Sequence, residues 1–282
     1  MSDQTSPPFD PRQYWEERLR GDCDLAGVGY RRLGRFYNAW MYRVRARVFA
    51  RVARSLPVDW QRARVLDVGS GTGFYVEQWH RLGVPRVTGV DLTDAAVEAL
   101  RRRFPEDHFE QLDIGQPLAA GCSLLATTFD AVSAMDVLFH LVDDTAYAQA
   151  FLNLAALLAP GGWLLWSDNF VHHGTERVPH QVSRSLAEST GAVEAAGFEV
   201  VRRVPMFVVM NYPADSRSRL AKLAWTGLVA PAAVAEPLGW LLGAGLFPLE
   251  LALVRAMRES PSTEMMVCRK AEGRKDGKTE GV

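Results

Sequence analysis

The stretch Val65-Leu66-Asp67-Val68-Gly69-Ser70-Gly71-Thr72-Gly73 decides the fold. A short apolar run ends here in glycines at alternate positions, and residues 74–79 continue as the first turns of a helix. A strand that opens into a helix through glycines brings bare backbone close to a ligand, because no Cβ blocks the approach and a positive φ costs glycine little. Open α/β sheets bind their ligands at the carboxyl ends of the strands. The stretch therefore predicts a nucleotide-like site at residues 67–73.

Strands and helices alternate after this stretch. We expect strands at 65–68, 87–91, 108–113, 129–134, 163–168, from 198 onward and at 263–269, and helices at 74–82, 94–103, 145–158 and 185–196. Alternating elements of these lengths form right-handed βαβ crossovers. The pattern therefore predicts an α/β fold with a parallel sheet.

The composition is that of an ordinary globular protein. The chain has 282 residues, 48% of them hydrophobic, and a formal net charge of -1, so no global charge points to nucleic acid. Cys23, Cys122 and Cys268 lie far apart and form no CxxC pair, which predicts neither a zinc site nor a disulfide framework. Residues 1–10 hold no apolar run, so we expect no secretory signal and a cytoplasmic location.

An arginine-rich segment precedes the first strand. Residues 1–56 are expected to form an N-terminal helical segment, with helices at 11–20 and 35–56. Eight arginines and no acidic residue lie between Arg31 and Arg54. They predict either a solvated basic face or an anionic partner, such as a lipid surface or a phosphate-bearing substrate.

Residues 211–262 form an unusually apolar insertion before the last strand. From Leu223 to Leu249 the only charged residue is Glu236. A single membrane span prefers about 20 unbroken apolar residues. Three prolines interrupt this one, Pro231, Pro237 and Pro248. We expect two or three short helices that form a cap, with a peripheral membrane contact as the alternative; the tail at 271–282 is expected to be disordered.

Further motifs continue the glycine stretch. They are Gly89-Val90-Asp91-Leu92, Leu112-Asp113-Ile114, Phe129-Asp130, Asp136-Val137-Leu138-Phe139-His140-Leu141 and Leu158-Ala159-Pro160-Gly161-Gly162. In order and spacing they resemble the class I S-adenosylmethionine-dependent methyltransferases over roughly residues 60–205. The resemblance implies a Rossmann-like seven-stranded sheet, mostly parallel with an antiparallel last strand, and helices on both faces. Its core would span 57–210 with the final strand at 263–270, beneath an N-terminal helical cover.

The resemblance also implies the cofactor, S-adenosyl-L-methionine, with S-adenosyl-L-homocysteine as product. Asp91 can accept both ribose hydroxyls, because a carboxylate has two acceptor oxygens. Asp113 would accept from the adenine amino group, and Asp67 would orient the amino end of the cofactor. The full set assigned to the cofactor is Asp67, Gly69, Gly71, Gly73, Asp91, Leu92, Asp113, Ile114, Met135, Asp136 and, from the N-terminal helix, Tyr37.

Methyl transfer requires few catalytic groups from the protein. The cofactor brings the reactivity, and the chain aligns the acceptor with the methyl group and excludes water. A general base is needed only for a weakly acidic acceptor. His140 follows the fourth strand and has an ordinary pKa near neutrality, so it is the candidate base, with a purely structural role as the equal alternative.

Few residues in the sequence indicate which acceptor is methylated. His172, in a histidine-containing loop after the fifth strand, Arg184 and Trp225 are the candidate substrate-binding residues. A metal needs three or four converging ligands, and the histidine loop gives no fixed geometry, so no metal is expected. Ala134-Met135-Asp136-Val137 lacks the motif of base methyltransferases, so no nucleic acid is expected.

The apolar insertion favours O- or C-methylation of a hydrophobic small molecule, lipid- or isoprenoid-like. Two alternatives stay open. One is an enzyme that uses the same fold for non-methylating chemistry, such as a cyclase, and the other is a membrane-associated binding protein. The sequence does not indicate an oligomeric state.

Overall fold

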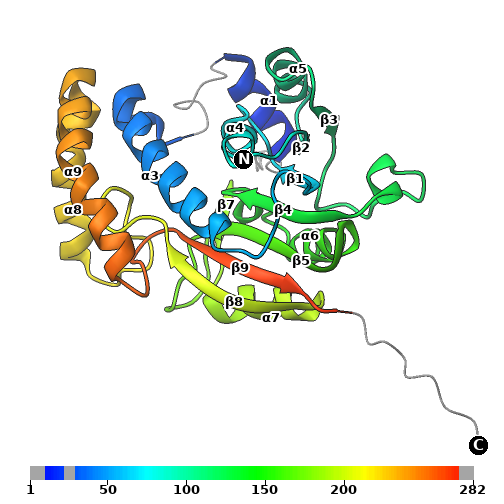
Figure 1. The fold of residues 1–282 in the computed structure, drawn as a ribbon. Coiled ribbons are helices and arrows are strands. Elements are labelled where there is room, and N and C mark those ends of the chain that lie inside the picture. Colours follow the sequence, from blue (N-terminus) through cyan, green and yellow to red (C-terminus); the bar gives the residue numbers. More distant parts are fainter. Residues whose placement is uncertain (1–9, 22–28, 273–282) are drawn as a thin grey trace, which may run out of the picture.

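The computed structural model describes residues 10–21 and 29–272, which surround one central sheet (Figure 1). Seven strands pair in the order β3-β2-β1-β4-β5-β9-β8. Their bounds are β1 Val65–Val68, β2 Val87–Asp91, β3 His108–Gln111, β4 Phe129–Met135, β5 Leu158–Asp168, β8 Phe198–Pro205 and β9 Glu264–Lys270. Only β9 runs against its neighbours β5 and β8. The expected Rossmann-like sheet with an antiparallel last strand is confirmed.

Helices cover both faces of the sheet. Side chains alternate along β1, so that Val65 joins one hydrophobic cluster while Leu66 and Val68 join the other. The helices of the first face are α3 Gly34–Arg54, α4 Phe74–Arg81, α5 Asp94–Arg103, α8 Arg219–Val234 and α9 Glu236–Ala256, and those of the second are α6 Asp144–Leu157 and α7 Leu186–Ala195. The shorter elements are α1 Pro11–Gly21, η1 Arg31–Leu33, η2 Ser123–Ala126, η3 Leu138–His140 and the hairpin of β6 Glu176–Val178 with β7 Gln181–Ser183.

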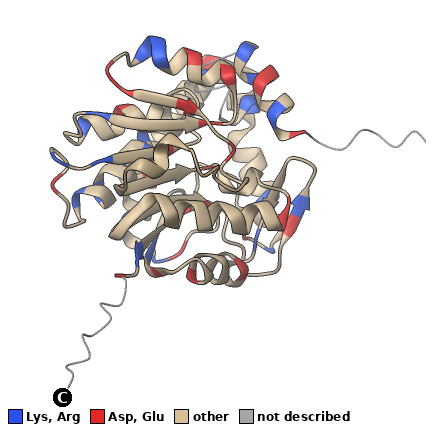
Figure 2. Ribbon diagram, turned by 90° about the vertical axis from the view of Figure 1, so that its right-hand side faces the viewer, with Lys and Arg blue, Asp and Glu red and all other residues tan. Residues whose placement is uncertain are grey.

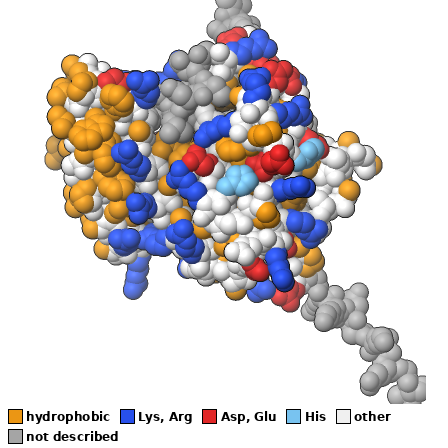
Figure 3. Space-filling view, turned by 45° about the horizontal axis from the view of Figure 1, so that its top comes forward, with side chains coloured by type: hydrophobic (Ala, Val, Ile, Leu, Met, Phe, Trp, Pro, Cys, Tyr) orange, Lys and Arg blue, Asp and Glu red, His pale blue; other side chains and the backbone are white. Residues whose placement is uncertain are grey.

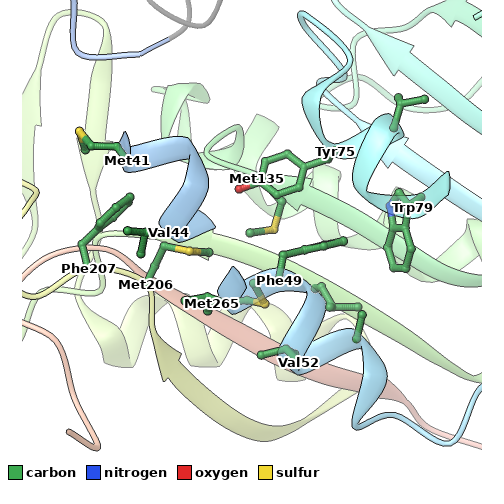
Figure 4. Close-up of a cluster of buried hydrophobic side chains, with 14 of the residues drawn as sticks. Met41, Val44, Phe49, Val52, Tyr75, Trp79, Met135, Met206, Phe207 and Met265 are labelled. Carbon is green, nitrogen blue, oxygen red and sulfur yellow. The ribbon is translucent and has the colours of Figure 1, made fainter. Parts of the chain in front are cut away.

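Helix α3 is part of the core. Figure 4 shows side chains of α3 packed against α4, β4, β9 and the segment after β8; those labelled are Met41, Val44, Phe49, Val52, Tyr75, Trp79, Met135, Met206, Phe207 and Met265. The buried positions of α3 recur every three or four residues, as expected for one face of a helix. The N-terminal helical region therefore takes part in building the site.

The structure corrects the expectation for the insertion. It forms two long helices, α8 and α9, instead of two or three short ones (Figure 1). Pro237 lies in the first turn of α9, where its missing N–H costs no helical hydrogen bond, whereas Pro231 and Pro248 are carried inside α8 and α9. Packing of α9 along α3 offsets the helical bonds that these prolines remove.

Local signals place most helix ends. Thr93 accepts from the Ala96 N–H at the start of α5, and Ser185 forms a capping box with Glu188 at the start of α7. β5 begins at Leu158, five residues before the expected start, and its pairing with β4 is irregular at 159–162, where Gly161 has a φ of 75°. Residues 22–28, between the two expected N-terminal helices, and residues 273–282 of the tail expected to be disordered lie outside the described residues.

Candidate functional site

The loop after β1 is built for glycine. Gly69, Gly71 and Gly73 all have positive φ, at 69°, 51° and 78°. A Cβ on Gly69 would lie 2.3 Å from a methyl carbon of Val137. The Gly69 N–H donates to the Val90 carbonyl at 2.8 Å, which fixes the loop against β2. Only glycine adopts this path without strain, so the loop leaves open backbone facing a cavity.

Asp91 ends β2 with its carboxylate held in place. The Gly71 N–H donates to Oδ2 at 2.8 Å, while the Thr93 N–H and hydroxyl both donate to Oδ1. The residue is 7% exposed, and burial raises its pKa. A carboxylate oxygen accepts two hydrogen bonds, so Oδ2 keeps a lone pair for a ligand hydroxyl.

Asp113 and Ile114 follow β3. The Gly115 N–H donates to Asp113 Oδ1 at 2.9 Å, so one carboxylate oxygen closes a turn and the other stays available. Ile114 is buried and presents an apolar wall next to it. A planar ring with an amino group would find an acceptor and an apolar surface here.

One cavity of about 710 Å³ joins these features. The predicted cofactor residues that line it are Gly69, Gly71, Asp91, Leu92, Asp113, Ile114, Met135 and Asp136. Because β1, β2 and β4 are parallel, their carboxyl ends meet at one edge, which gathers these residues from distant parts of the chain.

Asp67, Gly73 and Tyr37 lie outside the residues that line the cavity. The Asp67 carboxylate accepts from the Ser133 hydroxyl at 2.5 Å beneath the loop, and burial raises its pKa to about 7. Gly73 is the N-cap of α4. The Tyr37 hydroxyl donates to the Met210 carbonyl at 2.9 Å inside the core. These residues lie behind the cavity lining, and their roles toward the cofactor stay predictions, with Asp67 expected to act through water or backbone.

An ion pair between Arg45 and Asp136 crosses the cavity lining, and sequence analysis missed it. Asp136 has a φ of 59°, and its Oδ1 accepts from the Ser167 hydroxyl at 2.9 Å. Arg45 of α3 pairs with Oδ2. One signal could have identified Arg45. It lies four residues after Met41 and next to Val44, both of which are buried, so its position on the helix directs it toward the core.

His140 lines the same cavity as a neutral imidazole. Its Nδ1 lies 2.9 Å from the His180 carbonyl oxygen, so Nδ1 must carry the proton and Nε2 keeps its lone pair. The ring packs edge-on against Trp15 at 4.8 Å. Burial lowers the pKa of His140 to about 4, which keeps it uncharged at neutral pH.

Much of the remaining lining of the cavity is aromatic and apolar. Its side chains come from α1, the segment before η1, α3, η3, the β6–β7 hairpin and the segment after β8: Trp15, Leu19, Tyr30, Met41, Tyr42, Phe139, Val178 and Tyr212. Arg18, Arg31 and Arg32 add positive charge at its margin. Sequence analysis missed Phe139, Val178 and Tyr212, because no local pattern places three separate segments at one edge.

The three candidate acceptor residues lie elsewhere. His172 pairs with Asp215 at 2.7 Å, and the Arg184 guanidinium pairs with Asp144 at 2.8 Å. Trp225 packs against Tyr30 and Tyr212 with ring centroids at 5.9 and 5.4 Å. None is among the described residues that line the cavity. Direct contact of His172, Arg184 and Trp225 with the acceptor therefore stays a prediction; of the three, only Trp225 belongs to the α8–α9 pair, which lies beside α3.

Comparison with known proteins identifies the central part of the chain. Residues 65–162 match the family model described as a methyltransferase domain. The chain is 39% identical over 105 residues to the ubiquinone biosynthesis O-methyltransferase of Xanthomonas axonopodis pv. citri (strain 306), which covers 37% of this chain and 42% of the relative. The enzyme of the same name from Methylocella silvestris is 35% identical over 109 residues, 39% and 41% of the two chains. The match thus spans less than half of these curated relatives.

Solved structures resemble the chain over a greater length. The N-methyltransferase NodS from Bradyrhizobium japonicum WM9, in complex with S-adenosyl-L-homocysteine, has a TM-score of 0.55 at 16% identity and covers 93% of this chain and 99% of its own. Magnesium protoporphyrin IX methyltransferase from Synechocystis PCC 6803, with bound S-adenosylmethionine, has a TM-score of 0.55 at 14% identity, covering 95% and 100%. The [4+2]-cyclase SpnF has a TM-score of 0.52 at 21% identity, covering 81% of both chains. At these identities the likeness establishes the fold alone.

Proposed function

We propose, from the membership of its core in the class I S-adenosylmethionine-dependent methyltransferases, that this chain transfers a methyl group from S-adenosyl-L-methionine to an oxygen or carbon of a hydrophobic small molecule. The observation that carries the proposal is the continuity of the 710 Å³ cavity. Its lining combines the Gly69 loop, Asp91 and Asp113 with aromatic side chains that include Tyr30 and Tyr212. A volume of this order suits a cofactor and part of an acceptor together.

The residues present fit the cofactor. Asp91 Oδ2 retains capacity for a ribose hydroxyl, and Asp113 has one oxygen outside its turn. The open backbone at Gly69 and Gly71 leaves room for the methionine portion. When bound, S-adenosyl-L-methionine would supply an electrophilic methyl group on a sulfonium. What remains for the chain is to bind it, orient the acceptor and exclude water.

An oxygen acceptor is favoured over carbon or nitrogen. The curated relatives are O-methyltransferases of ubiquinone biosynthesis. His140, neutral and with a free Nε2 lone pair, can take the proton of a hydroxyl as it becomes a nucleophile. Trp15, Tyr30 and Tyr212 can enclose an aromatic ring.

Calorimetry with S-adenosyl-L-homocysteine tests the cofactor. We expect binding by the native chain and a loss of at least about tenfold in affinity for Asp91→Ala, because a hydrogen bond to a charged group is removed. Glu98→Ala is the matched control, since Glu98 lies on the exposed side of α5 and pairs with Arg102 there. Absence of binding by the native chain would refute the proposal.

Turnover tests the reaction. The protein is incubated with S-adenosyl-L-methionine and a set of phenols that carry apolar substituents. The masses of the products are then measured by mass spectrometry. We expect one added methyl group per acceptor and an equal amount of S-adenosyl-L-homocysteine. A rearranged product without an added methyl group would support cyclase-type chemistry instead.

A further inference from the structure

The outer face of the α8–α9 pair is apolar and uncovered. Leu220, Leu223 and Val234 of α8 are 76%, 68% and 80% exposed, and Leu241 of α9 is 60% exposed. On α8 these positions fall on one stripe at helical spacing. Leu228, Leu238, Trp240 and Leu249 extend the exposed set. Figure 3 shows a broad hydrophobic area on the side of the molecule where α8 and α9 lie. A contiguous patch of this kind marks an interaction site.

Both acidic residues of this helix pair are engaged by backbone N–H groups, Glu250 in the interior and Glu236 half-buried at the start of α9. Glu236 accepts from the backbone N–H groups of Arg35 and Phe36, each at 2.8 Å, and so caps α3. Glu250 is fully buried, and its carboxylate accepts from the N–H groups of Val208 and Val209. No third acid occurs between residues 219 and 256. Apart from the half-buried Glu236 at one end, where it caps α3, the described residues of the pair therefore present no carboxylate.

A row of arginines borders this face. Arg43, Arg47, Arg51 and Arg54 follow one another along α3 at spacings of three or four residues, and α3 contains no acid. The Arg43 guanidinium lies 4.1 Å from the Trp40 ring centroid, and Trp40 in turn contacts Trp240 of α9 at 5.9 Å. Figure 3 shows basic side chains in a column along the apolar area. On the opposite side, in Figure 2, acidic and basic residues are interspersed.

From this juxtaposition we propose that the apolar face of α8–α9 and the arginine row of α3 dock together on an anionic phospholipid bilayer. An apolar surface combined with a basic border supplies the two contributions that hold a protein at a membrane interface. An apolar protein partner alone would leave the arginine row without a counterpart. The inference does not depend on the reaction that the chain catalyses.

The geometry makes this a peripheral contact. α9 is long and apolar enough to cross a membrane by length and composition. It is, however, bound along α3: Gly243 lies against Trp40, Gly239 lies against Tyr37, and Glu250 binds backbone after β8. Drawing α9 into a bilayer would expose these contacts. The helix pair therefore lies on the membrane, with its outer side chains inserted.

The docking face adjoins the cavity. Trp225 lies on the buried side of α8 and contacts Tyr30 and Tyr212, which line the acceptor end. If the proposed function holds, a bilayer-dissolved acceptor would reach the cavity beside this wall, and turnover of such an acceptor would depend on docking, whereas turnover of a water-soluble one would not.

Flotation of the full chain with vesicles tests the surface. We expect binding to phosphatidylcholine vesicles that contain phosphatidylglycerol, little binding to phosphatidylcholine alone, and loss at high salt, where the screening length falls to about 3 Å. Arg43→Gln/Arg47→Gln should weaken binding by about fivefold for each arginine. Leu223→Glu/Leu241→Glu should abolish it.

Matched controls lie on other surfaces. Leu152→Glu changes a leucine of α6 that is 51% exposed, and Arg102→Gln changes an exposed arginine of α5. Both should bind vesicles as the native chain does. Calorimetry with S-adenosyl-L-homocysteine should be unaffected in every variant, which separates this inference from the proposed function.

Three outcomes would overturn the inference. The first is no binding to phosphatidylglycerol vesicles at low salt. The second is equal binding to neutral and anionic vesicles, since the arginine row would then have no role. The third is a dimer by size-exclusion chromatography with light scattering that Leu223→Glu/Leu241→Glu converts to monomer without any vesicle binding, because a second copy would then cover the face.

Discussion

The Arg45 guanidinium of α3 and the Asp136 carboxylate after β4 form an ion pair within the cavity lining, with side chains only 12% and 25% exposed. The pair ties the N-terminal helix to the edge of the sheet where the strands end. Removing one partner of a buried pair leaves the other charge uncompensated.

We therefore expect Arg45→Gln to lower the free energy of unfolding by about 2 kcal/mol. The double variant Arg45→Gln/Asp136→Asn should recover part of that loss, because it leaves no unpaired charge. Arg47→Gln, on the exposed side of α3, is the control and should change stability by less than about 0.5 kcal/mol. Urea denaturation measures all three. An Arg45→Gln variant as stable as the control would show that the pair contributes nothing.

His140 should make the protein sensitive to acid. Its pKa in the folded chain is about 4, below the ordinary value of about 6.5, so the unfolded chain binds the proton more tightly. The contribution of the neutral ring to the free energy of unfolding is fully present above about pH 6.5. It is lost as the pH falls toward 4. Between pH 7 and pH 5 the native chain should lose about 2 kcal/mol more than His140→Gln. His108→Gln, at an exposed site, serves as the control; parallel pH curves for the native chain and His140→Gln would contradict the assignment.

His140 is also the predicted base. With an oxygen acceptor, His140→Gln should lower kcat by about 10²-fold while leaving the affinity for S-adenosyl-L-homocysteine unchanged. Because the pKa of the ring is about 4, the rate of the native enzyme should show no titration of this group between pH 6 and 8. A kcat within about threefold of native would favour the structural role.

Asp168 is expected to destabilise the fold at alkaline pH. It is buried, its Oδ2 has no hydrogen-bond partner among the described residues, and burial raises its pKa to about 8. A carboxyl group with a raised pKa stabilises the fold at low pH and loses that contribution as the pH rises through 8. Asp168→Asn should therefore gain more than about 1 kcal/mol over the native chain between pH 5 and pH 8. Thermal unfolding measures the gain, and exposed Asp94→Asn should show none.

Gly69 should not tolerate a side chain. Gly69→Ala combines a left-handed backbone with a contact of 2.3 Å to Val137, so we expect a loss of about 2 kcal/mol and weaker cofactor binding. Gly191→Ala, within α7 and facing open space, should instead raise stability by about 0.5–1 kcal/mol. Equal effects of the two substitutions in urea denaturation would refute the role given to the Gly69 turn.

Sequence analysis succeeded where the signal is local. Asp91, Asp113 and Asp136 each lie at the carboxyl end of a strand or within two residues of it, and parallel strands end at one edge, so their convergence could be predicted without knowing any side-chain packing. It did not predict that the Asp67 carboxylate turns under the loop to Ser133, because the direction of a side chain at a strand end depends on the neighbouring strand. The partner of Asp136 was missed for a similar reason, since Arg45 lies 91 residues away.

The sequence also did not predict where α8 and α9 lie relative to the rest of the fold. Their apolar composition predicted a cap over the acceptor, yet neither helix supplies a residue to the cavity as the described residues line it. The fit of Gly243 against Trp40 and the capping of α3 by Glu236 hold the pair beside α3. An apolar composition predicts that part of a helix pair is buried against another apolar surface. The complementary shape of the two surfaces decides which surface that is.

The sequence by itself therefore determined the sheet, the glycine loop after β1 and the edge at which a ligand binds, because periodicity and turn residues act over a few neighbouring positions. The tertiary structure alone decided which aromatic residues enclose the acceptor end, which arginine neutralises Asp136 and which face of the insertion remains exposed. These features arise from contacts between segments far apart in the chain, and the free energy of such contacts depends on complementary shape that no local pattern encodes.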